Sequence, residues 1–197
     1  MFARTPRLLL RPGWMEDAPA LAQAIGNDAV LRNLSRAPAP YGLADAEAFL
    51  ALPQDSRMPR LLAFTRTQGA PRLVGGCGIH LSEDGAPELG YWIGRPYWGL
   101  GFATEASRAV VEIAKTIGHR KLVASHFTDN PASGNVLRKL GFQSTGKTAQ
   151  RHSNGRGIAT TCALYERSLD ATTTDGDDMR NTRPLGMREY MERLQAA

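Results

Sequence analysis

Cysteine is scarce in this chain, and the usual marks of secreted and membrane proteins are missing. The only two cysteines, Cys77 and Cys162, are far apart in the sequence, so we expect neither a disulfide framework nor a metal site. No apolar run approaches the roughly 20 residues of a membrane span. The opening, MFARTPRLLLRPGW, has no long apolar stretch before a small-residue cleavage site. We therefore expect a cytoplasmic protein with no membrane partner.

Long runs of one charge are also missing. Lys and Arg number 24 against 19 Asp and Glu, and the resulting formal charge of +5 is spread along the chain. Basic and aromatic residues do not interleave on one stretch, so we do not expect a nucleic-acid partner. A hydrophobic content of 42% is ordinary for a globular protein. The length suits one domain with a sizeable core.

Hydrophobic periodicity and turn residues predict one mixed α/β sheet. Helices are predicted at 18–25, 45–52, 103–117 and 131–140. Strands are predicted at 7–11, 61–66, 73–81, 121–127, 142–146 and 160–168, with a central strand beginning at residue 88 and a loop at 151–156. We expect this domain to span residues 1–169. Residues 170–197 are predicted to form a polar linker and a short C-terminal helix.

Residues 88–105, ELGYWIGRPYWGLGFATE, combine a strand, a glycine-rich turn and the start of a helix. The free N–H groups of a first helical turn converge on one point, where the helix dipole favours an anion. Gly99 and Gly101 would let the backbone close on a phosphate. A P-loop is excluded because Gly-Phe-Ala-Thr stands where Gly-Lys-Ser/Thr is needed, and Thr104 breaks the dinucleotide-binding fingerprint.

Two segments together resemble the GNAT superfamily of N-acetyltransferases. They are GYWIGRPYWGLGFATEA and DNPASGNVLRKLGF, and the similarity is strongest to the Rim-type branch that acetylates ribosomal-protein N-termini. The resemblance covers about residues 5–169. It implies a GNAT fold, an α/β fold whose mostly antiparallel sheet of about seven strands is flanked by helices and splayed between the fourth and fifth strands.

The resemblance also implies an activity and its cosubstrate. We expect transfer of acetyl from acetyl-CoA, without a metal, to a primary amine that attacks directly in a ternary complex. The acceptor would be a protein N-terminus or a small amine, and a homodimer is left open. The alternative is a non-catalytic CoA-binding module that acts as a sensor or scaffold.

The family's cofactor-binding positions fall on the turn and on the strands beside it. The polar Gln/Arg lead of the loop pattern is missing, since Pro96, Tyr97 and Trp98 precede Gly99. Trp92, Ile93 and Gly94 would pair with the pantetheine arm, and the N–H of Trp92 or Ile93 would polarise the thioester carbonyl. The backbone expected to hold the diphosphate is that of Gly99, Leu100, Gly101, Phe102, Ala103 and Thr104.

The catalytic residues that the resemblance implies are Glu88 and Ser133. Glu88 would accept the amine proton, with His80 or His126 as alternatives, and Ser133 would protonate the departing sulfur. Many family members use a tyrosine further along the same helix, where this chain has Val136, Leu137 and Arg138. Asn130 would either bond the pantetheine arm or cap its helix. Arg151, His152 and Arg156, if they face the acceptor, would favour an acidic one.

Overall fold

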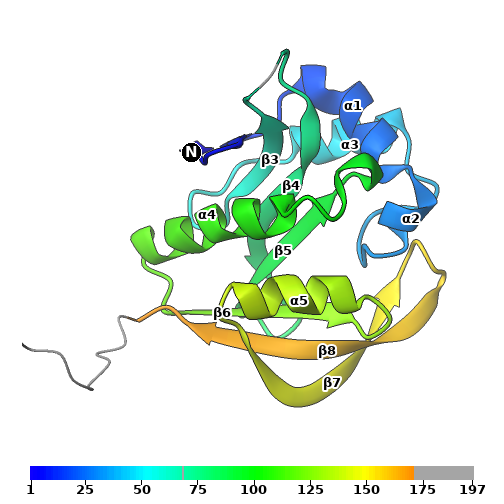
Figure 1. The fold of residues 1–197 in the computed structure, drawn as a ribbon. Coiled ribbons are helices and arrows are strands. Elements are labelled where there is room, and N and C mark those ends of the chain that lie inside the picture. The colour runs from blue at the N-terminus through cyan, green and yellow to red at the C-terminus, as the bar shows by residue number, and fades with distance from the viewer. Residues whose placement is uncertain (68, 171–197) are drawn as a thin grey trace, which may run out of the picture.

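The computed structural model describes residues 1–67 and 69–170 as one sheet with helices on both faces (Figure 1). The strands are β1 (Ala3–Arg4), β2 (Leu8–Arg11), β3 (Arg60–Thr65), β4 (Leu73–Leu81), β5 (Pro87–Ile93), β6 (Lys121–Phe127), β7 (Gln143–Ser153) and β8 (Ile158–Ser168). The helices are α1 (Ala18–Ile25), α2 (Asp28–Leu31), α3 (Leu43–Ala51), α4 (Phe102–Thr116) and α5 (Pro131–Lys139), with single-turn helices η1 (Met15–Asp17) and η2 (Arg95–Tyr97). This is the mixed α/β architecture that the sequence predicts.

The sheet has the strand order β1-β2-β3-β4-β5-β6-β8-β7. Every neighbouring pair is antiparallel except β5 with β6. These two strands share one register pair, Glu88 with Val123, and their ribbons diverge beyond it (Figure 1). We call the gap between residues 89–93 and 124–127 the β5–β6 opening. It is the splay expected between the fourth and fifth strands. These strands are numbered β5 and β6 here because the sequence does not predict the two-residue β1.

Two apolar clusters hold the helices on the sheet. Buried side chains of α4 and α5, such as Val110 and Leu137, pack on one face. Side chains of α1 to α3, such as Leu21, pack on the other face together with Trp92 of β5. Since side chains alternate along a strand, Glu88 and Gly90 point to the same face as Trp92. The α1–α3 face therefore carries the proposed base, while α4 and α5 cover the opposite side.

The structure confirms most predicted elements and lengthens one. The strand expected at 142–146 continues to Ser153, because Gly146, with φ of 72°, forms an irregularity between Ser144 and Thr148 instead of ending the strand. Arg151 and His152 therefore lie in β7, so the predicted loop at 151–156 is too long. Apart from residue 170, the predicted linker and C-terminal helix lie outside the described residues. Within the described ranges, no helix has the length and apolar character needed to span a bilayer.

Candidate active site

The turn between β5 and α4 leaves a row of backbone N–H groups without protein partners. Gly99 and Gly101 have φ angles of 77° and 81°, a region that strains any residue with a Cβ. The first backbone bond into α4 runs from the Glu105 N–H to the Gly101 carbonyl at 3.1 Å. Across the described chain, no acceptor bonds the N–H groups of residues 99–104. These donors at a helix N-terminus form a site suited to an anion.

Arg7, just before β2, holds this turn in place. Its Nη1 donates to the Leu100 carbonyl at 2.9 Å, and its Nε donates to Glu105 Oε2 at 2.7 Å. Thr5 Oγ1 donates to Glu105 Oε1 at 2.6 Å. Burial raises the pKa of Glu105, but the bonds from Thr5 and Arg7 outweigh it and hold the pKa below its ordinary value. A charged pair that the sequence analysis did not identify thus fixes the turn against β2.

The edge of β5 that faces the opening offers backbone donors at alternate residues. The Gly94 N–H donates to the Val74 carbonyl of the β4 side at 2.8 Å. By the alternation of antiparallel pairing, the N–H of Trp92 also points toward β4, and those of Tyr91 and Ile93 point toward the opening. Of the two amides proposed to polarise the thioester, Ile93 is therefore the suitable one. The N–H of Gly94 is already bonded to the Val74 carbonyl, so it is not available to a pantetheine arm.

Trp98 stands where the family pattern has a polar residue. Its indole Nε1 donates to the Ile93 carbonyl at 2.6 Å, and the Arg95 guanidinium lies 4.7 Å from its ring centroid. The indole therefore holds the turn to the end of β5 by a bond inside the protein. The missing polar lead is replaced by a structural contact.

Asn130 and Ser133 meet at the start of α5. Asn130 Oδ1 caps the helix by accepting from the Ser133 N–H at 3.3 Å. The Asn130 side-chain NH₂ donates to no acceptor in the part of the chain that the structure describes. Asn130 thus serves as the cap and keeps a donor for a ligand. Ser133 Oγ lies 2.8 Å from the hydroxyl of Tyr91, a residue to which the sequence analysis gave no role.

Glu88 is buried in a polar network, with 3% of its surface exposed. Its Oε1 accepts from Ser125 Oγ at 2.8 Å and from Arg151 Nη1 at 2.8 Å. His80 Nε2 lies 3.6 Å from its Oε2. Burial raises the pKa of Glu88, but His80, Arg151 and Ser125 outweigh it and lower the pKa to about 2. A carboxylate that is occupied by Ser125 and Arg151, and that has so low a pKa, accepts a proton poorly, which argues against Glu88 as the general base.

The two histidines differ in their surroundings. His80 pairs with Glu88 across β4 and β5, and its side chain is 37% exposed. Its ring covers Gly90, where a Cβ would lie 2.9 Å from His80 Cε1. His126 instead bonds the Phe127 carbonyl through Nδ1 at 2.8 Å and packs beneath α5 against Gly134. His80 is therefore the histidine on the α1–α3 face.

Comparison with known proteins decides the family. The family described as Acetyltransferase (GNAT) domain matches residues 7–143. This chain belongs to the GNAT acetyltransferase family. It is 33% identical to YoaA of Bacillus subtilis (strain 168), an uncharacterized N-acetyltransferase, over 165 residues that cover 77% of this chain and 88% of YoaA. The chain is an acetyl-CoA-dependent N-acetyltransferase, as the two motifs predict.

Solved structures of Rim-type enzymes share the fold of this acetyltransferase. RimL, a ribosomal L7/L12 alpha-N-protein acetyltransferase solved with coenzyme A, matches with a TM-score of 0.71 and 22% identity over 87% of this chain and 99% of RimL. The ribosomal-protein-S5-alanine acetyltransferase of Vibrio fischeri matches with a TM-score of 0.70 and 17% identity over 87% and 98%. The predicted GNAT fold is confirmed.

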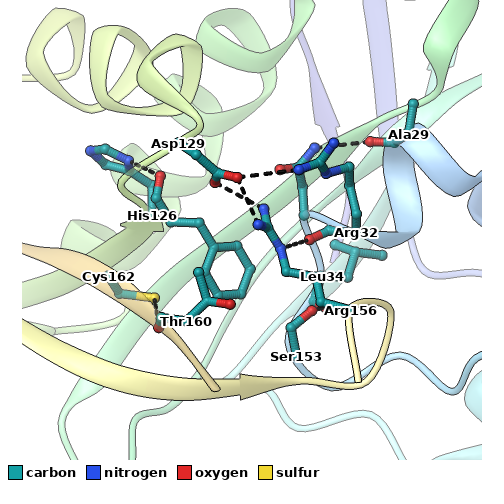
Figure 2. Close-up of polar contacts among 11 residues, drawn as sticks. Ala29, Arg32, Leu34, His126, Asp129, Ser153, Arg156, Thr160 and Cys162 are labelled. Atoms are coloured by element: carbon teal, nitrogen blue, oxygen red, sulfur yellow. Dashed lines mark hydrogen bonds and ion pairs between the residues drawn. The ribbon is translucent and has the colours of Figure 1, made fainter. Parts of the chain in front are cut away.

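The tip of the β7–β8 hairpin docks on the segment that follows α2 (Figure 2). Ser153 Oγ donates to the Leu34 carbonyl at 3.1 Å, and Arg156 Nε donates to the Arg32 carbonyl at 2.7 Å. Both terminal nitrogens of Arg156 donate to Asp129, at 2.7 and 2.9 Å. We call this contact of residues 153–157 with residues 31–36 and Asp129 the hairpin dock. It joins the tip of the β7–β8 hairpin and the segment after α2 to the turn before α5.

The hairpin dock also changes the charge expected at the acceptor site of the acetyltransferase. Asp129 pairs with both Arg156 and Arg32, which lower its pKa, so these three side chains together keep one net positive charge. Arg151 is neutralised by Glu88. The expected preference for an acidic acceptor therefore loses the charge of Arg151 as its support. Within residues 1–67 and 69–170, no group of three His, Cys, Asp or Glu side chains is arranged to hold a metal ion.

Proposed function

We propose that this acetyltransferase moves the acetyl group of acetyl-CoA directly to a primary amine within one ternary complex. The main support is the row of free amides at residues 99–104, which fits a diphosphate, beside an opening that fits an extended pantetheine arm. Acetyl-CoA supplies the activated acetyl group. Gly99, Leu100, Gly101, Phe102, Ala103 and Thr104 would hold its diphosphate.

Three further groups would orient the pantetheine arm and the thioester. The N–H groups of Tyr91 and Ile93 point into the opening, and the side-chain NH₂ of Asn130 is free at its other side. Ile93 would donate to the thioester carbonyl and stabilise the negative charge that develops there, as oxyanion-type donors do. Trp92 and Gly94 would line the opening without donating a hydrogen bond to the pantetheine arm, since their N–H groups face β4.

We propose His80 as the acceptor of the amine proton and Glu88 as its anionic partner. Imidazole is basic near neutral pH, which suits a general base. With a hydrogen on Nε2 directed at Glu88, the other ring nitrogen, Nδ1, is left to accept the proton from the attacking amine. The Glu88 carboxylate, 3.6 Å from Nε2, would pair with the imidazolium that results. Ser133, at the start of α5, would donate to the sulfur as the carbon–sulfur bond breaks.

The acceptor that we propose is the α-amino group of a peptide, with a small amine as the alternative. The support is the shared fold with RimL and with the S5-alanine acetyltransferase, whose names state that they acetylate ribosomal proteins. On the α1–α3 face, Arg151 is paired with Glu88, which lowers the positive charge that would repel a protonated amine before it gives up its proton.

Thiol release from acetyl-CoA tests this function. We would mix the purified chain with acetyl-CoA and peptides that begin with Ser or Ala, and compare each with the same peptide blocked at its N-terminus. Polyamines, amino acids and aminoglycosides complete the panel. Release with free but not blocked peptides supports the proposal. An absence of CoA binding at saturating cofactor overturns it, and binding without turnover in every amine class favours the sensor or scaffold module.

A further inference from the structure

Tyr91 and Ser133 meet across the β5–β6 opening, where the sheet lacks strand pairing. The Tyr91 hydroxyl oxygen lies 3.0 Å from the Ser133 carbonyl oxygen and 2.8 Å from Ser133 Oγ. Tyr91 comes from the middle of β5, and Ser133 from the first turn of α5. No other side-chain hydrogen bond joins β5 to α5 in the described part of the chain. This contact therefore fixes the position of Ser133 relative to the strand that would carry the thioester.

The hydrogen atoms of this pair allow two arrangements. The single phenolic hydrogen of Tyr91 bonds either the Ser133 carbonyl or Ser133 Oγ. In the first case, the Ser133 hydroxyl satisfies the Tyr91 oxygen with its own hydrogen. In the second case, the Tyr91 O–H donates to Ser133 Oγ, and the serine hydrogen is free to point elsewhere. Only the second arrangement offers the Ser133 O–H to a ligand in the opening.

We propose that Tyr91 is a positioning residue that turns the Ser133 O–H toward the sulfur of coenzyme A. This inference rests on the proposed function. As the carbon–sulfur bond breaks, its electron pair stays on sulfur, and the Ser133 O–H hydrogen-bonds the thiolate that forms. No proton leaves Tyr91, and the serine keeps its hydrogen. The bond from Tyr91 polarises the serine hydroxyl and makes it a stronger donor.

The surroundings of Tyr91 suit a donor that stays neutral. Burial raises the pKa of Tyr91, so the phenol has little tendency to lose its proton to a thiolate. The phenol therefore orients the serine and does not act as the acid itself. This chain brings a phenol to the start of α5 from β5, whereas the part of the helix where many family members have a tyrosine holds Val136, Leu137 and Arg138.

The pKa of the thiol of bound coenzyme A tests the inference directly. We would titrate the ultraviolet absorbance of the thiolate in the CoA complex and subtract the complex with desulfo-CoA, which lacks the sulfur. A hydrogen bond to the thiolate lowers this pKa, here by about one unit or tenfold in the acid constant. Tyr91→Phe and Ser133→Ala should each remove the shift, and the double variant should remove no more. Ser133→Thr, which keeps a hydroxyl, should retain it.

Tyr165→Phe is the matched control, because Tyr165 is a buried tyrosine whose ring packs 5.4 Å from that of His126. It should leave the shift unchanged. If Tyr91→Phe lowers the unfolding temperature but leaves the thiol pKa unchanged, the pair is only a structural tie and the inference is wrong. A shift lost in Ser133→Ala alone also overturns the role of Tyr91. If wild-type protein binds no CoA, the proposed function fails and this inference falls with it.

Discussion

The negative charge of Glu88 is predicted to stabilise the fold, although the side chain is buried. Glu88→Gln keeps the size of the side chain and removes its charge. The guanidinium of Arg151, with 17% of its side chain exposed, would then face an uncharged amide in a site that excludes water. Breaking a buried pair from one side is costly because the remaining charge has lost its partner.

The magnitude follows from the pKa of Glu88. Folding lowers this pKa from 4.5 to about 2, and each pKa unit corresponds to about 1.4 kcal/mol. The charged form therefore contributes about 3 kcal/mol to the free energy of unfolding. Because the folded-state pKa is depressed, the contribution is complete above the unfolded-state value. It should be lost as the pH falls from about 5 toward 2.

Urea denaturation between pH 7 and pH 3 measures this contribution. Glu112→Gln is the control, because Glu112 lies on α4 with 60% of its side chain exposed. Glu88→Gln should be about 3 kcal/mol less stable than wild type at pH 7, and the gap should narrow as the solution is acidified. A gap that stays constant across this range, or that equals the gap for Glu112→Gln, would refute the assignment of a strongly depressed pKa.

Three further predictions concern the site. His80→Gln should lower kcat/KM about 100-fold without weakening CoA binding, as measured by calorimetry. Full activity of this variant would show that another group is the general base. Gly99→Ala and Gly118→Ala, at φ of 77° and 90° with open space around each, should each cost about 1 kcal/mol. Only Gly99→Ala should weaken CoA binding. Equal CoA affinities of the two variants would show that the turn does not bind the cofactor. Arg156→Met should raise KM for the acceptor but not for acetyl-CoA in steady-state kinetics, and an equal rise in both would contradict a role confined to the acceptor side.

The local parts of the fold could be predicted from the sequence, because they depend on neighbouring residues. The glycine turn before α4, the bounds of β6 and the cap at Asn130 all follow from short-range patterns. The surroundings of individual side chains could not be predicted in this way. Glu88 has the residue type of a base, but its low pKa depends on His80 of the neighbouring strand and on Arg151, 63 positions further along the chain.

The same limit applies to Tyr91 and to β7. Tyr91 meets Ser133 across 42 positions, and no short pattern joins them. The predicted end of β7 is wrong because Gly146 is a residue type typical of turns, while the residues on both sides of it pair with β8. Sequence pattern identifies a glycine with a left-handed backbone, but it does not distinguish a bulge from a chain reversal.

The single register pair between β5 and β6 has a consequence for amide hydrogen exchange. A strand in the middle of an eight-stranded sheet normally exchanges its hydrogens slowly. In this protein, the hydrogens of Tyr91 and Ile93 point into a gap and should exchange as quickly as those of an edge strand, while that of Gly94 stays protected by Val74. A pantetheine arm bound in the gap would slow the exchange of the Tyr91 and Ile93 amides. The exchange rates of these two central residues would therefore report whether the β5–β6 opening is occupied.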